Sequence, residues 1–260
     1  MTEGATEKKR RGGAATLGVD LASQPKKTVA ALIRWDADRA TVELHLRADD
    51  AKILALARAA EVSGVDAPFG WPRPFVDFLA ADGGARARQR WDNAYRDALT
   101  YRRTDAFVRS VTGSLPLSVS ADRIAYVAMR CGLLLAQLGV TDRSGDGRVF
   151  EVYPGAALGQ WGLRKGDEGS YKQGAKGEGA RRTILGRLLQ ACPWLALSAE
   201  QRSACVASDD VLDALIAALN ARAAQLGRIL RPATDEDREL ARVEGWIALP
   251  EAGALAGLLS

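Results

Sequence analysis

The segment Ala14–Leu46, AATLGVDLASQPKKTVAALIRWDADRATVELHL, decides the fold. It contains three apolar runs, Ala14–Leu21, Thr28–Trp35 and Ala40–Leu46, which are separated by two short polar segments. Runs of this length with alternating or branched apolar residues are typical of β-strands. Because each connection is short, we expect the three strands to form consecutive antiparallel pairs.

Helices and further strands follow this start in alternation. The patterns predict a helix at Asp49–Ala60, a buried strand at Val62–Asp66, a helix at Ile124–Leu138 and a strand at Val149–Tyr153; three later helices are expected at Arg181–Gln190, from near Ser198, and at Ser208–Leu226. Three antiparallel strands followed by helix–strand units predict an α/β fold, a mixed sheet with helices on both faces.

The chain divides into a tail and one domain. Residues 1–13 read as a flexible basic tail and 14–255 as the domain. Within the domain, residues 73–122 hold eight arginines and six aspartates without a long apolar period, which indicates an arginine-rich, partly helical insertion. Residues 159–179 are rich in glycine and charge, and we expect a mobile surface loop there.

Composition excludes several classes of protein. The 260 residues carry a formal net charge of +4, one histidine and three cysteines, Cys131, Cys192 and Cys205. Structural zinc sites and histidine-based triads need more of these residues than the chain supplies. We expect the cysteines to be reduced and buried, as in a cytoplasmic protein. No segment has the pattern of a signal sequence or of a membrane span.

Four aspartates interrupt otherwise apolar patterns. Asp20 lies within the first strand, Asp66 ends the strand before a Pro/Gly-rich loop, and Asp210 and Asp213 are three residues apart on the last long helix. Residues at that spacing share one side of a helix, where like charges repel unless a cation lies between them. Divalent cations such as Mg²⁺ take carboxylate ligands. Three of the four also have a structural interpretation: Asp20 as an arginine partner or a turn cap, Asp66 as a turn former, and Asp210 as a helix N-terminal acid. Asp213 fits such an interpretation less easily, because it lies past the first turn beside an apolar stripe.

Glu151 is a further acid within a strand that we expect to be buried. It is either an additional ligand or supporting group of the same site, or the buried partner of an arginine.

Six motifs spread over about residues 16–250 resemble the family called domain of unknown function 429, predicted nucleases of ribonuclease-H-like fold: Gly18–Ala22, Val65–Gly70, Arg103–Asp105, Glu151–Pro154, Asp209–Leu215 and Glu244–Ile247. A wider resemblance is to Holliday-junction resolvases of that fold, in which one acid lies on the first strand, one ends the fourth, and two lie three apart on the last helix. The second acid is commonly glutamate there and is Asp66 here. The arginine-rich insertion has no counterpart in small resolvases.

The resemblance and the acid pattern together predict a divalent-metal-dependent nuclease. Asp20, Asp66, Asp210 and Asp213 would hold Mg²⁺ or Mn²⁺, and the partner would be DNA or RNA. Cations suited to phosphate are present in the insertion and the glycine-rich loop region, and we expect four to bind substrate: Arg102, Arg103, Lys172 and Arg181.

Two other functions stay open. A phosphotransferase or ATPase of the same fold needs a glycine- and threonine-lined phosphate loop after the first aspartate, and Leu21–Pro25 contains neither residue. A non-catalytic nucleic-acid-binding module requires that the carboxylates be satisfied by arginines, with no open metal site.

Overall fold

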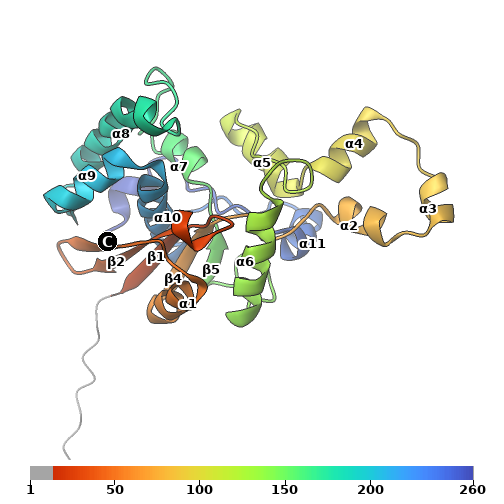
Figure 1. Cartoon of the computed structure of the whole chain (residues 1–260), viewed down its shortest axis with the longest axis horizontal. Helices are drawn as coiled ribbons and strands as arrows, with labels where there is room; N and C mark the ends of the chain where they lie inside the picture. Colours follow the sequence, from red (N-terminus) through yellow and green to blue (C-terminus); the bar gives the residue numbers. More distant parts are fainter. Residues whose placement is uncertain (1–13, 260) are drawn as a thin grey trace, which may run out of the picture.

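The computed structural model describes residues 14–259, so the tail predicted for residues 1–13 lies outside the described residues. Six strands form one sheet (Figure 1): β1 Ala15–Asp20, β2 Val29–Trp35, β3 Ala40–Leu46, β4 Val62–Asp66, β5 Val149–Glu151 and β6 Leu195–Ala196.

The sheet mixes parallel and antiparallel pairs in the strand order β5-β4-β1-β2-β3-β6. β1, β2 and β3 are consecutive antiparallel neighbours, as the short connections predict. β4 is parallel to β1, β5 to β4, and β6 to β3. The expected α/β architecture with a mixed sheet is therefore confirmed.

Helices cover both faces of the sheet (Figure 1). One apolar core lies between the sheet and two helices, α1 Asp50–Ala59 and α6 Ala125–Gln137. The other core lies on the opposite face beneath four helices: α7 Pro154–Gln160, α8 Glu178–Ala191, α9 Ala199–Ala207 and α10 Asp209–Gln225. Three short 3₁₀ turns complete this body: η1 Pro25–Lys27, η2 Gly174–Gly177 and η3 Ala254–Gly257.

Side-chain alternation along β1 assigns its residues to the two faces. Leu17 and Val19 enter the core beneath α1 and α6. Thr16 and Gly18 face α10, where the Thr16 hydroxyl donates to the carbonyl of Ala218 at 3.0 Å. Asp20 continues this second series, so it emerges on the α10 side at the end of the strand.

Two glycines allow α10 to lie directly on the sheet. Gly18 of β1 and Gly64 of β4 are paired in register. A Cβ built on Gly18 would lie 2.1 Å from the amide nitrogen of Ala218, and one on Gly64 would lie 2.7 Å from the carbonyl oxygen of Ala217. Only glycine fits such an approach of backbone to backbone.

The insertion 73–122 consists mainly of short helices that extend away from the sheet in Figure 1. They are α2 Arg73–Ala80, α3 Gly83–Ala87, α4 Asn93–Thr100 and α5 Arg103–Thr112. Neither α2 nor α3 contains a buried residue, which explains why the segment shows no long apolar period.

One carboxylate anchors two helix N-termini of the insertion. Glu244 ends α11 Asp235–Glu244 and is buried. Its Oε1 accepts from the amide of Arg73 and its Oε2 from the amide of Arg103, both at 2.7 Å. These amides are the first of α2 and α5, where a helix N-terminus favours negative charge.

The cysteines agree with the sequence-based prediction, and the segment 159–179 does not. Cys131, Cys192 and Cys205 are free and buried, as predicted. The segment expected as a mobile surface loop instead places the side chains of Trp161, Leu163 and Tyr171 in the core. Among residues 14–259, no helix combines the length and apolar character needed to cross a bilayer.

Candidate functional site

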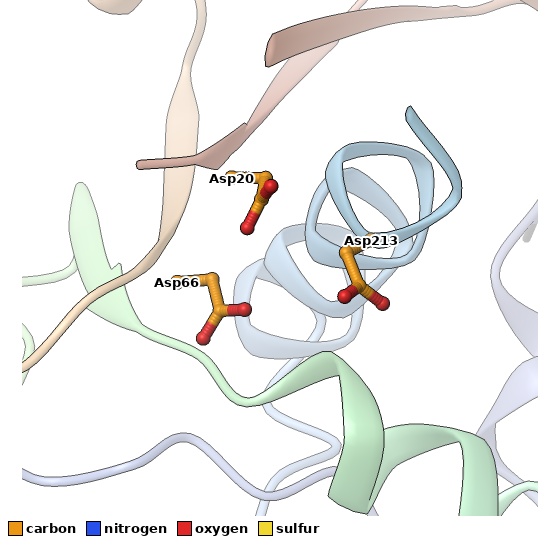
Figure 2. A group of neighbouring side chains, drawn as sticks. All are labelled: Asp20, Asp66 and Asp213. Carbon is orange, nitrogen blue, oxygen red and sulfur yellow. The ribbon is translucent and has the colours of Figure 1, made fainter. Parts of the chain in front are cut away.

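Three carboxylates from separate parts of the chain meet at one point. Asp20 ends β1, Asp66 ends β4 and Asp213 lies on α10. One carboxylate oxygen from each lies within 4.8 Å of the others. Figure 2 shows the three side chains turned toward a common centre from two strand ends and the helix.

Strand register and helix contact produce this convergence. Asp20 and Asp66 are paired residues of neighbouring parallel strands, so their side chains leave the same face of the sheet. Gly18 and Gly64 lie two residues earlier and admit the α10 backbone. The close contact brings Asp213 against the two strand ends.

Asp213 is held by two neighbouring residues of the segment after α7. The Tyr171 hydroxyl donates to Asp213 Oδ1 at 2.9 Å, and the Lys172 ammonium lies 2.9 Å from Asp213 Oδ2. Arg181 holds this segment in place, because its buried guanidinium donates to the carbonyls of Tyr171 and Gly174. The position of the Asp213 carboxylate therefore depends on residues that do not belong to α10.

Burial and mutual repulsion raise the pKa values of these acids. Burial is the largest cause for Asp20, and the charges of Asp66, Asp213 and Asp210 raise its pKa further. Burial raises the pKa of Asp66 to about 7, although Lys172 opposes the shift. The pKa of Asp213 is raised by burial, against the lowering effect of Lys172. Burial alone would lower the pKa of Lys172, but Asp213, Tyr171 and Asp66 raise it.

The donor set suits a hard divalent cation. Carboxylate oxygens are the ligands that Mg²⁺ and Mn²⁺ prefer, and a cation between these three acids would relieve their repulsion. Lys172 now supplies part of that compensation. Its side chain is 46% exposed, so the ammonium has a path to solvent when another cation takes its place.

Two of the three acids line a pocket of about 390 Å³, and Asp213 lies behind Tyr171 and Lys172, which also line it. Asp20 and Asp66 are on its wall, together with Lys172 and Arg164. The site is thus open to a small ligand at the carboxyl ends of parallel strands, where ligands bind in open α/β sheets.

Asp210 is not part of the three-acid group. It lies in the first turn of α10 and is partly buried, and burial followed by the neighbouring charge of Asp209 raises its pKa. It acts on the group from outside, as one of the charges that raise the pKa of Asp20.

Glu151 is committed to an arginine. Its two oxygens accept from the Arg102 guanidinium at 2.7 and 2.8 Å, and Oε2 also accepts from the Phe69 amide at 2.9 Å. Of the two interpretations of Glu151, the structure has the buried arginine partner. The carboxylate fixes the loop after β4, which keeps Asp66 in place.

The four cations expected to bind substrate have different surroundings. Arg102 is buried, and its guanidinium makes five hydrogen bonds to Asp105, Glu151 and the carbonyl of Glu244. Five is the full donor capacity of arginine, so Arg102 has none left for a phosphate. This corrects its assignment as a phosphate clamp.

Arg181 is likewise buried, and its guanidinium donates to four backbone carbonyls. Its place is structural rather than at a substrate surface. Arg103 pairs with Asp237 at 2.5 Å and lines a different pocket. Arg102 and Lys172 both line the pocket of the acids, but the guanidinium donors of Arg102 are already engaged.

Two further residues beside the acids are not among those that the sequence predicts for the site. Tyr171 is one of them, and its hydroxyl donates to Asp213 Oδ1. Arg164 was not singled out, because the glycine-rich segment that contains it looked like mobile surface; it lines the pocket with its guanidinium 5.7 Å from the centre of the Tyr171 ring.

Comparison with known proteins gives a family and nothing more specific. No curated protein and no solved structure matches the chain. A family model does match, over residues 18–238, a range that includes all three converging acids. The chain therefore belongs to the family described as protein of unknown function (DUF429).

Proposed function

We propose that this protein is a divalent-metal-dependent nuclease of ribonuclease-H-like fold. The observation that carries the proposal is the convergence of Asp20, Asp66 and Asp213, whose oxygens lie within 4.8 Å of one another. Three antiparallel strands followed by parallel strands and a helix that carries the third acid support the fold assignment. The arrangement needs no histidine, which agrees with the composition.

Asp20, Asp66 and Asp213 would hold Mg²⁺ or Mn²⁺, and Asp210 would add negative potential near Asp20. Bound divalent ions supply Lewis acidity and lower the pKa of water for attack on a phosphodiester. Tyr171 orients Asp213 through its hydrogen bond, and Arg102 keeps Glu151 and the loop after Asp66 in position. The protein's part is thus to hold three carboxylates close together despite their repulsion.

A non-catalytic binding module is the competing function. The observation in its favour is the Lys172–Asp213 ion pair, because an ammonium already compensates part of the acid charge. Under this alternative Lys172 is a permanent internal counterion, and divalent ions leave the protein unchanged.

Cleavage assays test the proposal directly. The wild type, Asp20→Asn and a matched control, Asp38→Asn, are incubated with single-stranded, duplex and branched DNA and RNA in Mg²⁺ or Mn²⁺. Asp38 is exposed in the turn between β2 and β3, outside the site. We expect cleavage by the wild type and the control and a loss of at least ~100-fold in Asp20→Asn. Equal cleavage by all three proteins, or none by any, would overturn the proposal.

A further inference from the structure

The pocket beside the acids has two chemically different walls. Acids and cations occupy one wall: Asp20, Asp66, Arg164 and Lys172. Apolar side chains occupy the other, contributed by the end of the insertion and the start of α6: Pro116, Leu117, Ile124 and Val127. A ligand that fills the pocket therefore meets both charged and apolar side chains.

Arg164 is the unpaired cation on the polar wall. Its Nε is buried and has no hydrogen-bond partner, and across residues 14–259 its guanidinium makes no ion pair. The guanidinium lies beside the Tyr171 ring, whose hydroxyl contacts Asp213. Buried donors are rarely left unpaired, so this group points to an anionic ligand.

The apolar wall is open to solvent in part. Leu117 is 60% exposed, between α5 and α6, while it lines the pocket. An exposed leucine that follows Pro116 in the pocket lining is suited to the flat face of an aromatic ring. A nucleobase offers such a face only when it is outside a duplex stack.

We propose that this pocket takes one unpaired nucleotide, with a phosphate on Arg164 and the base against the wall formed by Pro116 and Leu117. The inference rests on the proposed function and deepens it by naming single-stranded nucleic acid as the substrate class. The pocket's 390 Å³ agrees with a small-molecule site, for which ~300–1,000 Å³ is usual. Arg164 shares the pocket with Asp20 and Asp66, so the phosphate that it holds would lie on the same substrate strand as the scissile one.

Binding measured without cleavage tests this inference separately from the proposed function. The anisotropy of a labelled single-stranded oligonucleotide is followed against a hairpin duplex of the same sequence, in Ca²⁺ and in EDTA. We expect the wild type to bind the single strand at least ~10-fold more tightly than the duplex. Arg164→Gln should weaken single-strand binding by at least ~10-fold. The matched control Arg182→Gln, an exposed arginine on α8 paired with Glu178, should leave it unchanged.

A second pair of measurements isolates the base contact. Leu117→Ala should weaken binding of the normal strand by ~3-fold or more and should have little effect on a strand with abasic sites. Arg164→Lys serves if Arg164→Gln disturbs folding, because it keeps the charge and loses the paired guanidinium contacts; its affinity should fall between the two.

Equal affinity for single strand and duplex, or an Arg164→Gln variant that binds like the wild type, would overturn the inference. Single-strand binding without hydrolysis would leave it standing and reject the proposed function. Hydrolysis of duplex, together with unchanged binding by Arg164→Gln, would reject the inference and leave the proposed function standing.

Discussion

Gly18 of β1 lies against the backbone of α10 so closely that a Cβ at this position would be 2.1 Å from the amide nitrogen of Ala218. The same helix carries Asp213, and the same strand ends at Asp20. The backbone separation that brings the two acids together is therefore set by a contact that contains no side chain, and Tyr171 and Lys172 then hold the Asp213 carboxylate.

Gly18→Ala should displace α10 and separate the acids. We expect a loss of ~2–4 kcal/mol in the free energy of unfolding, together with loss of any divalent-ion stabilisation. The control is Gly186→Ala on α8, where no atom lies within 4 Å of the added Cβ. It should be neutral or stabilising by up to ~1 kcal/mol. Chemical denaturation of both variants checks this, and equal stability would contradict the role assigned to Gly18.

Arg102→Met should strongly destabilise the protein. It leaves Glu151 and Asp105 buried without their cation, which costs about 3–5 kcal/mol. Arg34→Met is the control, because Arg34 forms an exposed pair with Glu43 and should change stability by less than ~1 kcal/mol. Urea unfolding measures both. Wild-type stability in Arg102→Met would restore Arg102 as a candidate substrate ligand.

Divalent-ion stabilisation should increase with pH. The folded-state pKa of Asp66 is raised from near 3.8 to about 7, mainly by burial. The stability that its protonation contributes is thus complete below pH 4 and lost as the pH rises through about 7. Cations bind the deprotonated acids, so Mg²⁺ should raise the melting temperature little at pH 5.5 and clearly at pH 8. A rise in melting temperature on addition of Mg²⁺ that is the same at pH 5.5 and pH 8 would contradict this titration.

Lys172→Met should separate a replaceable counterion from a permanent one. Without the ammonium, the acids repel more strongly and the metal-free melting temperature should fall at pH 8. The increment produced by Mg²⁺ should become larger than in the wild type, because no ammonium competes for Asp213. Lys176→Met is the control, since Lys176 is exposed on η2 and has no salt bridge among the described residues. If Mg²⁺ raises the melting temperature of neither the wild type nor Lys172→Met, the result would favour the non-catalytic module.

The sheet and the three converging acids were predictable because they interrupt a regular pattern. Asp20 breaks the alternation of β1, Asp66 ends an apolar strand, and Asp213 borders an apolar helical stripe. Such placements cost stability unless the groups act together, so the sequence alone marks them.

The burial and the partners of the arginines were not predictable in the same way. Arg102, Arg103 and Arg181 read alike as surface cations, yet two are buried by partners distant in sequence. The partner of an arginine depends on tertiary structure, and local composition contains no signal for it.

The two-residue strand β6 is too short to show any periodicity in the sequence. The N-terminus of α11, in contrast, has a sequence signal in the capping box formed by Thr234 and Asp237.

The most direct test of the central claim is an anomalous diffraction map of crystals grown with Mn²⁺. We predict a peak coordinated by Asp20, Asp66 and Asp213, with the Lys172 ammonium displaced from Asp213. A map with no peak between these carboxylates, and Lys172 still paired with Asp213, would contradict the account.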